Sequence, residues 1–337
     1  MLQKCRDVWV DNVKVVACAL VAFGHFFQSM VQAGVLPETG LYLWFDQTIY
    51  YFHVPLFFIC SGYLYQKYGC VNSVRSWWKN VRKKALGLGV PYFTFSIATW
   101  LLKSVFSDSV NSQAMGLFDT LFLYPTSQFW YLYCLFFVFL ITPTFPSRKA
   151  AGIGLLCAAA LNAAFFAGWN PDIRAVSTVM ANEIWFVLGM CLSMNNFTLH
   201  MKKTPALVAG TGLLALFTAA SVWVCLTGFS FFGISTVMGL MACAGVILIM
   251  AAYFSDHGQN KLFGFLAKYT LPIYVMHTIF AAGMRSALLK LGIGSALVHT
   301  VLGIGISFAG PIIAAVIMKK SKWLEFFLYP GKFIKIK

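Results

Sequence analysis

Long apolar runs alternate with short polar connections along the whole chain. Each run approaches the ~20 residues that an α-helix needs to cross the hydrocarbon core of a bilayer. The pattern predicts about ten transmembrane helices, at residues 8–30, 43–65, 86–103, 129–146, 150–168, 181–199, 205–227, 233–254, 263–283 and 296–318.

The fourth of these segments is the least regular. Residues 104–128 form a long polar connection, and the apolar run after it is bounded by proline. A re-entrant segment is the alternative there, because protein can cover backbone that does not cross the bilayer. We treat residues 1–318 as a single polytopic domain and residues 319–337 as a basic, aromatic cytoplasmic tail of the kind that anchors at the interface.

Composition excludes a water-soluble fold. Of the 337 residues, 60% are apolar and 10% are charged, against roughly 45–50% and 25% in soluble domains. The expected fold class is therefore an all-α integral membrane protein. No Walker loop, GxSxG elbow, HExxH or paired-carboxylate motif occurs, and the nine cysteines form no CxxC. We therefore predict no ATPase or hydrolase chemistry and no metal.

Charge orients the chain in the membrane. The net charge is +15, from 25 Lys and Arg against 10 Asp and Glu. With the spans above, 20 of the 25 basic residues fall on one side and four on the other, with Lys14 inside a span. This asymmetry is the positive-inside pattern, and it leaves no need for a nucleic-acid partner. An even number of spans then places both termini in the cytoplasm.

Ionisable side chains inside membrane spans are costly, so each is a functional candidate. In the first span, Lys14 and His25 are eleven residues apart, which is three turns plus roughly 20° and roughly 16 Å along an α-helix. They share one face, with Lys14 nearer the cytoplasm, His25 in the outer third and Asp11 close to the same stripe. Imidazole is the side chain best suited to accept a proton near neutral pH.

Both residues also have a plainer interpretation. Lys14 alone is typical of a lysine that extends toward the membrane surface. A lone His25 is typical of a core histidine bonded to a backbone carbonyl. Their common face, with Gly24 directly before His25, favours a chemical role.

Two further spans combine proline with histidine. The second contains FHVPLFFICSGYL, with His53 and Pro55 near mid-membrane and Ser61 toward the inner side. The ninth contains LAKYTLPIYVMH, with a central proline and with Tyr274 and His277 three residues apart on one face. Two proline-broken helices that carry histidine indicate a polar cavity. Helix kinks satisfied by neighbouring helices are the alternative.

Two acidic residues, Asp46 and Glu183, lie near the outer ends of spans. Either can orient an imidazole by accepting its second N–H, or can contact a polar substrate outside the membrane. The alternative is that both are exposed acids at the membrane interface.

These motifs together resemble a known family. The stretch VDNVKVVACALVAFGH is similar to the first-helix signature of the membrane acyltransferase 3 family, in which an Asp and then a basic residue precede Gly-His by about eleven positions. FHVPLFFICSGYL, FWYLYCLFF, WFVLGM and LAKYTLPIYVMH resemble later blocks in order and spacing. The FHVPLFF form is most similar to the fucose 4-O-acetylase-like branch. The resemblance covers about residues 6–283.

The resemblance implies an integral, multi-pass O-acyltransferase in the inner membrane of a bacterial cell. Such an enzyme moves an acyl group, usually acetyl, from cytoplasmic acyl-CoA to a hydroxyl of a cell-surface glycan or its lipid-linked precursor. His25 matches the histidine held essential in the family, and Glu183 is a candidate carboxylate to assist it. Lys14 matches the basic partner, although Arg is commoner there and makes a bidentate contact with phosphate that Lys does not.

The basic linker between the second and third spans fits the same function. Its Arg75, Arg82 and Lys83 are candidates to hold the nucleotide phosphates of acyl-CoA, and Ser61 lies on the same inner side. Positive-inside charge alone explains this linker equally well. The residues assigned to the substrate cavity are Asp11, Asp46, His53, Tyr274 and His277.

Two other functional classes stay open. A secondary transporter of a small polar solute would also have about ten spans and broken helices, but it ought to show duplication between its halves, and none is evident. A non-catalytic membrane sensor or scaffold would not need Lys14 and His25 on one face. The acceptor, the acyl chain and the oligomeric state do not follow from the sequence.

Overall fold

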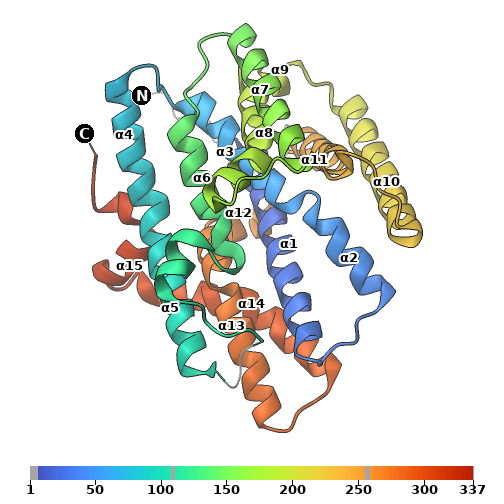
Figure 1. Cartoon of the computed structure of the whole chain (residues 1–337), viewed down its shortest axis with the longest axis vertical. Helices are drawn as coiled ribbons and strands as arrows, with labels where there is room; N and C mark the ends of the chain where they lie inside the picture. Colours follow the sequence, from blue (N-terminus) through green and yellow to red (C-terminus); the bar gives the residue numbers. More distant parts are fainter. Residues whose placement is uncertain (1–6, 108–110, 255–258, 337) are drawn as a thin grey trace.

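The computed structural model describes residues 7–107, 111–254 and 259–336, which form helices joined by short connections and contain no strand (Figure 1). Within these residues, seven helical stretches are long and apolar enough to cross a membrane. The all-helical fold is therefore confirmed within these residues, and the seven helices are consistent with a membrane protein. The total of ten spans and the cytoplasmic position of the termini stay predictions. The seven are α1 (Val8–Gln32), the continuous stretch of α4 (Val74–Lys84), η1 (Ala85–Gly89) and α5 (Val90–Val105), then α7 (Arg148–Phe166), α8 (Arg174–Met194), α10 (Lys203–Thr227), α11 (Ile234–Tyr253) and α14 (Ala296–Met318).

The other predicted spans are shorter or interrupted helices. The second is split into α2 (Gly40–Tyr50) and α3 (His53–Tyr68), and the ninth into α12 (Lys261–Ala267) and α13 (Thr270–Lys290). The fourth is shortened to α6 (Trp130–Ile141). The remaining short elements are η3 (Asp119–Leu123), η4 (Ser127–Phe129), α9 (Phe197–His200), α15 (Lys322–Leu328) and η5 (Pro330–Lys332).

Proline sets two of these boundaries, because it lacks a backbone N–H and its ring clashes with the carbonyl four residues earlier. Pro55 lies in the first turn of α3, so the helical path breaks just before it, at residues 51–52. Thr142 is extended and precedes Pro143, so α6 ends at Ile141 rather than at the predicted residue 146.

The ninth predicted span is also broken beside its proline, as expected, and the break precedes the proline. Pro272 lies in the first turn of α13, and the chain leaves the helix before it, at residues 268–269. A proline costs no helical hydrogen bond in the first turn, because those N–H groups have no partner inside the helix. The helix that carries His277 is therefore unbroken to Lys290.

The predicted basic linker between the second and third spans is itself helical. Its basic residues lie on α4, which continues into α5 through the five π-helical residues of η1. Pro91 lies in the first turn of α5. Proline has no backbone N–H to continue the α-helical hydrogen-bond pattern, and the π-helical turn of η1 lies directly before it.

The central helix is α1, which contacts α3, α11, α12, α13 and α14 (Figure 1). The most extensive helix pair is α3 with α8. A Cβ at Gly62 would overlap the carbonyl oxygen of Phe186, and one at Gly189 would overlap that of Ile59. Glycine at both positions lets the two backbones touch, as small residues do between membrane helices.

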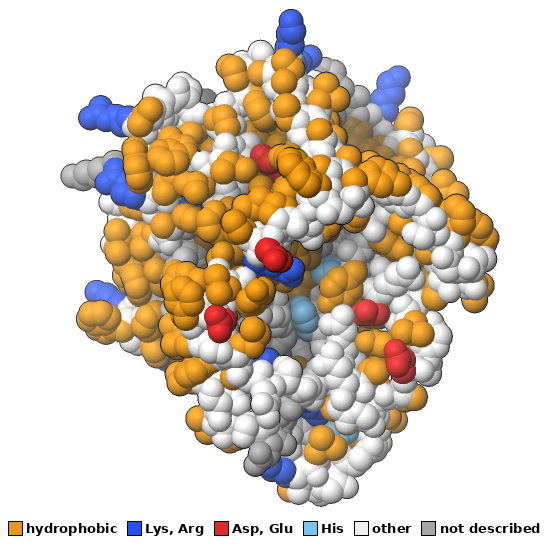
Figure 2. Space-filling model, in the orientation of Figure 1, with side chains coloured by type: hydrophobic (Ala, Val, Ile, Leu, Met, Phe, Trp, Pro, Cys, Tyr) orange, Lys and Arg blue, Asp and Glu red, His pale blue; other side chains and the backbone are white. Residues whose placement is uncertain are grey.

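Peripheral helices expose their apolar side chains. In the most apolar parts of α7 and α10, only 17% and 22% of the residues are buried, and Leu156 and Leu226 are 72% and 80% exposed. Apolar side chains also cover much of the face in Figure 2. An apolar surface of this extent matches lipid as its solvent.

The tail is folded onto the helices. α15 packs against α5, and the Tyr329 hydroxyl donates to the carbonyl oxygen of Lys268 at 3.4 Å. An ion pair of 2.6 Å joins Lys332 to Glu325 within the tail. The predicted tail is thus attached to the C-terminal end of α12 and is also rich in aromatic residues.

Candidate active site

A cavity of about 780 Å³ opens beside the C-terminal half of α1. Residues of α1, α5 and α13 form its walls, together with the connections at residues 111–112 and 126–127. Its volume lies within the range of small-molecule sites. Figure 2 shows histidine side chains inside a hollow on this face. The polar side chains of the lining are His25, Gln28, Ser29, Gln32, Thr99, Lys103, Asn111, Ser112, Thr126, Ser127, Thr278, Arg285, Ser286 and Lys290.

His25 is paired with His277. Their ring centroids are 5.5 Å apart and the ring planes are inclined by 35°. Nδ1 of His277 lies 2.9 Å and 3.0 Å from the carbonyl oxygens of Ile273 and Tyr274. Because carbonyl oxygens only accept, Nδ1 carries the proton and Nε2 carries the lone pair. That Nε2 is buried and has no hydrogen-bond partner among the described residues, so it is an acceptor beside the His25 ring.

His53 is the third imidazole of this region. It is the first residue of α3, and its Nδ1 donates to the carbonyl oxygen of Ile49 at 2.5 Å. Its ring packs edge-on against Tyr50, with centroids 4.7 Å apart. His53 and His277 are both electrostatic neighbours of His25, so α1, α3 and α13 bring the three predicted histidines together. Among the described residues, no group of three or more His, Cys, Asp and Glu is arranged to hold a metal ion.

Asp46 is connected to the cavity by a hydrogen bond from the side-chain amide of Gln28. Gln28, which lines the cavity, donates from Nε2 to Oδ1 of Asp46 at 2.9 Å. The Tyr50 hydroxyl donates to Oε1 of the same Gln28 at 3.1 Å. Asp46 therefore fixes the orientation of a lining side chain and does not itself form the wall.

Lys14 lies on the same unbroken helix as His25, three turns nearer its N-terminus. The Cys60 thiol of α3 has Lys14 and Asp11 as electrostatic neighbours. Lys84, the last residue of α4, is another neighbour of Lys14, and its ammonium lies 3.4 Å from the centroid of the Phe139 ring. Lys14 of α1 thus has Cys60 of α3 and Lys84 of α4 as electrostatic neighbours.

A buried aromatic cluster lies beside both regions. Tyr274 donates its hydroxyl proton to the carbonyl oxygen of Gln128. The Tyr274 ring centroid is 5.8 Å from those of Phe57 and Tyr131. The Tyr131 hydroxyl lies 3.2 Å from the Ser61 hydroxyl. Because Ser61 follows Cys60 and Tyr274 is one turn before His277, this cluster joins the surroundings of Lys14 to those of His25.

Comparison with known proteins assigns the family. The sequence matches a family model described as an acyltransferase domain over residues 7–316, nearly the whole chain. The chain belongs to the membrane acyltransferase 3 family. It is also 29% identical, over 163 residues, to nodulation protein NolL of Mesorhizobium japonicum, in a stretch that covers 48% of this chain and 41% of NolL. The matched part therefore spans less than half of that relative, and no solved structure matches.

Of the predicted site residues, all of which are described, only His25 lines this cavity. Asp46, His53 and His277 lie behind or beside His25, and the other predicted residues lie farther from the cavity. Glu183 of α8 accepts a hydrogen bond of 3.0 Å from the Thr142 hydroxyl and does not line the cavity. Arg75, Arg82 and Lys83 are exposed on α4. Their placement is that of a charged helix at the membrane surface, which suits either a phosphate contact or the positive-inside pattern alone.

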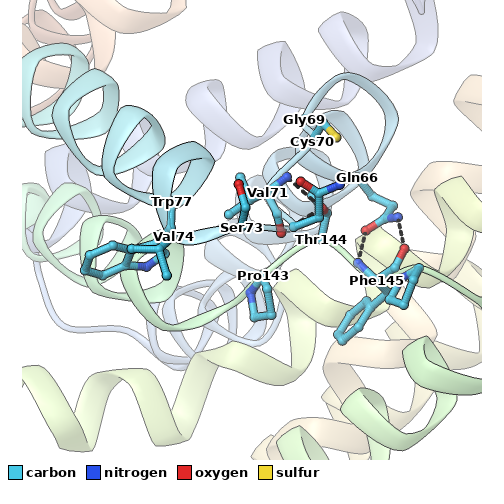
Figure 3. A pocket seen from close by; sticks show the side chains of 12 residues that line it. Gln66, Gly69, Cys70, Val71, Ser73, Val74, Trp77, Pro143, Thr144 and Phe145 are labelled. Carbon is cyan, nitrogen blue, oxygen red and sulfur yellow. Dashed lines mark hydrogen bonds between the residues drawn. The ribbon is translucent and has the colours of Figure 1, made fainter.

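A second cavity of about 800 Å³ lies beside the start of α4 (Figure 3). Residues between 66 and 77 and the connection 143–146 line it, and none of the five basic residues of α4 is part of that lining. Gln66 closes one wall through two hydrogen bonds with the backbone of Phe145, of 2.9 Å and 3.0 Å. The basic side chains of α4 thus do not converge on a closed site.

The sequence analysis did not identify four cations near the site. Lys103, Arg285 and Lys290 line the His25 cavity, and Lys84 neighbours Lys14. The rule that selected Lys14, a cation within or near a membrane helix, applies to Lys84 and Lys103 as well. Arg285 was not considered because the predicted ninth span ends at residue 283, whereas α13 continues to Lys290.

Proposed function

We propose that this acyltransferase moves an acyl group, by preference acetyl, from cytoplasmic acyl-CoA to a hydroxyl of a cell-surface glycan or its lipid-linked precursor. The observation that carries the proposal is the position of His25 in a polar cavity, on the same unbroken helix as Lys14. The two residues are roughly 16 Å apart along that helix. This separation is comparable to the extended pantetheine arm of CoA.

His277 prepares His25 to act as a base in this proposal. The lone pair of His277 Nε2 accepts the N–H of one His25 ring nitrogen, so the other nitrogen of His25 keeps its lone pair for the substrate. A small rotation of either ring is sufficient, because their centroids are 5.5 Å apart. A partner that fixes one tautomer is a common way to make a histidine an effective base.

The reaction is a direct transfer. The lone pair of the neutral His25 takes the proton of the acceptor hydroxyl while that oxygen attacks the carbonyl carbon of the thioester. A C–O bond forms, the C–S bond breaks, and CoA leaves as a thiolate. The proton held by His25 then passes to that thiolate or to water, which restores the base.

The donor enters at the Lys14 end in this proposal. Lys14 and its electrostatic neighbour Lys84 supply positive charge there, and ammonium groups bind phosphate oxygens through charge-assisted hydrogen bonds. Arg75, Arg82 and Lys83 extend this charge along the exposed side of α4. The pantetheine arm then runs past Ser61 and the aromatic cluster to His25.

The proposed setting is the inner membrane of a bacterial cell, with both termini in the cytoplasm. The donor side is then the side where charge places most basic residues, and the His25 cavity faces the other way. The transporter alternative has less support, because the match to the acyltransferase model covers residues 7–316.

The proposal is tested by the release of CoA thiol from acetyl-CoA in membranes that contain the chain and its endogenous glycans. We expect acceptor-dependent thiol release by the wild-type chain and its reduction to a few per cent in His25→Ala, at equal protein level and thermal stability. The control is His299→Ala, since His299 of α14 is buried outside the cavity and its Nε2 donates to the carbonyl oxygen of Ile293. Unchanged transfer by His25→Ala would remove His25 from the reaction.

A further inference from the structure

A chain of hydrogen bonds runs from the segment before α6 into the wall of the His25 cavity. The Ser127 hydroxyl donates to Oε1 of Gln128, and Nε2 of Gln128 donates to Oγ1 of Thr278 at 3.0 Å. Ser127 and Thr278 both line the cavity, whereas Gln128 is buried. One buried amide therefore connects two hydroxyl groups of the cavity wall.

Two further features hold this amide against α13. The backbone carbonyl oxygen of Gln128 accepts the hydroxyl proton of Tyr274, which lies one turn before Thr278 on α13. Ser127 has a φ of 50°, a left-handed conformation that is uncommon outside glycine and persists where the surrounding contacts require it. The position of the Gln128 side chain is thus fixed from both of its ends.

The hydroxyl of Thr278 is bonded differently from other threonine hydroxyls of the long helices. Several of these donate to the backbone carbonyl oxygen four residues earlier, as at Thr178, Thr218 and Thr300. For Thr278 that carbonyl belongs to Tyr274 and lies 3.0 Å from Nδ1 of His277, and Thr278 donates no bond of this kind among the described residues. Because its oxygen accepts the Gln128 amide, the hydroxyl proton of Thr278 is directed away from that amide.

Thr278 also lies next to the groups of the proposed reaction. It directly follows His277, whose ring centroid is 5.5 Å from that of His25, and it lines the same cavity as His25. A hydroxyl that accepts one hydrogen bond is a stronger donor of the next, because bonds in a chain polarise one another. Such a donor is useful where negative charge develops, as it does on the thioester carbonyl oxygen during attack.

We infer that Thr278 is the oxyanion donor of this acyltransferase and that Gln128 is its positioning residue. The inference rests on the proposed function and adds a catalytic residue to the same site. As the acceptor oxygen bonds to the carbonyl carbon and its proton passes to His25, one electron pair of the C=O bond moves to the carbonyl oxygen. The Thr278 O–H donates a hydrogen bond to that oxyanion and keeps its proton. The electron pair returns when the C–S bond breaks, and CoA leaves as a thiolate.

Thr278→Val tests the donor, because it keeps the shape of the side chain and removes the hydroxyl. We expect kcat for acceptor-dependent thiol release to fall about a hundredfold, as for the loss of one oxyanion donor, with both KM values nearly unchanged. Thr278→Ser should retain most of the kcat. The control is Thr300→Val, which removes a hydroxyl that is half-buried like that of Thr278 but lies outside the cavity. Equal kcat in wild type and Thr278→Val, or a rise in the acceptor KM alone, would overturn the inference.

A mimic of the tetrahedral intermediate gives a readout that does not depend on turnover. A trifluoromethyl ketone analogue of acetyl-CoA should bind Thr278→Val more weakly than wild type, by about the factor lost from kcat. CoA itself should bind both equally, which also shows that the variant is folded. Ligand-dependent thermal stabilisation provides both affinities. Equal affinity of the two proteins for the analogue would contradict an oxyanion contact from Thr278.

Gln128→Leu tests the positioning role. It should lower kcat about tenfold, as the loss of a partner that orients a reactive group does. In the Thr278→Val background the same change should have little further effect, because both residues act through one donor. Losses that multiply in the double variant would separate Gln128 from Thr278 and overturn its assigned role. The absence of acceptor-dependent thiol release by the wild-type chain would instead overturn the proposed function.

Discussion

At the scale of single residues, the three histidines of the site differ in their hydrogen-bond partners. His53 and His277 each donate Nδ1–H to backbone carbonyls of the preceding turn, which fixes their tautomers. The His25 ring makes no hydrogen bond to protein within the described residues and lies against the cavity. His25 is thus free to exchange a proton, and the other two are suited to hold its surroundings in place.

Variants of His277 test whether this residue orients His25 or only stabilises the fold. His277→Phe should lower kcat about tenfold to a hundredfold, as the loss of a partner that orients a reactive group does, with both KM values nearly unchanged. His277→Gln should retain more activity, because its amide oxygen still accepts an N–H from His25. Steady-state kinetics at matched expression provides the measurement. A fall in stability with normal kcat in the folded fraction would assign His277 to packing alone.

Lys14 gives a second prediction. Lys14→Ala should weaken acyl-CoA binding about tenfold, because it removes one charge-assisted contact to phosphate. Lys14→Arg should bind as well as wild type, since guanidinium keeps the charge and adds a donor. Binding is measured by CoA-dependent thermal stabilisation, with exposed Lys149→Ala as control. Equal CoA affinity in wild type and Lys14→Ala would place the donor elsewhere.

At the scale of elements, a helix break and a close helix crossing position the site. The break between α2 and α3 exposes the carbonyl oxygen of Ile49 to His53. The crossing of α3 with α8 brings the backbones together at Gly62 and Gly189. α3 also carries Phe57 of the aromatic cluster and Ser61, which contacts that cluster. The position at which α3 packs against α8 therefore affects the path between Lys14 and His25.

Gly62→Ala tests this crossing. The new methyl group would overlap the Phe186 carbonyl oxygen, and overpacking of this kind costs about 1–3 kcal/mol of unfolding free energy. We expect a lower midpoint of thermal unfolding in detergent. Gly212→Ala on α10 meets nothing within 4 Å, so it should keep or raise the midpoint through helix propensity. Equal midpoints in the two variants would show that the helices separate at little cost.

At the scale of the whole molecule, the two ends of α1 differ in charge and access. Lys14 has Cys60 of α3 and Lys84 of α4 as electrostatic neighbours, whereas His25 opens to a cavity lined by α5 and α13. If charge orients the chain as predicted, the donor and the acceptor approach from opposite sides of the bilayer. The aromatic cluster then lies along the route between them.

Sidedness is therefore the prediction for the whole molecule. In proteoliposomes of known orientation, acetyl-CoA on the cytoplasmic face should acetylate glycan acceptor present only on the opposite face. Product should be absent when both substrates are on that opposite face, because CoA then has no access to Lys14. Radiolabelled acetyl groups in the recovered glycan give the measurement. Product that forms only with both substrates on the cytoplasmic face would contradict a route across the membrane while preserving the acyltransferase.

The sequence by itself determined that the chain is suited to a lipid environment, that it is helical, and which residues are candidates for chemistry. Apolar runs of bilayer length need no knowledge of packing, because each helix satisfies its own backbone hydrogen bonds. Helical periodicity also relates Lys14 to His25 within α1, since both lie on one rigid element. The resemblance to the acyltransferase 3 family followed from motifs in order, and the family match confirmed it.

Only the tertiary structure decided which side chains meet. Helical periodicity shows which residues share one face of a helix, but not which other helix that face contacts. It therefore did not show that His277 lies beside His25, or that Glu183 accepts a hydrogen bond from Thr142. The sequence indicated a helix broken beside Pro272 but not the exact position of the break, which depends on how the chain turns at residues 268–269. Lys103 and Arg285 are 182 positions apart in the sequence and share a cavity only because α5 and α13 pack together.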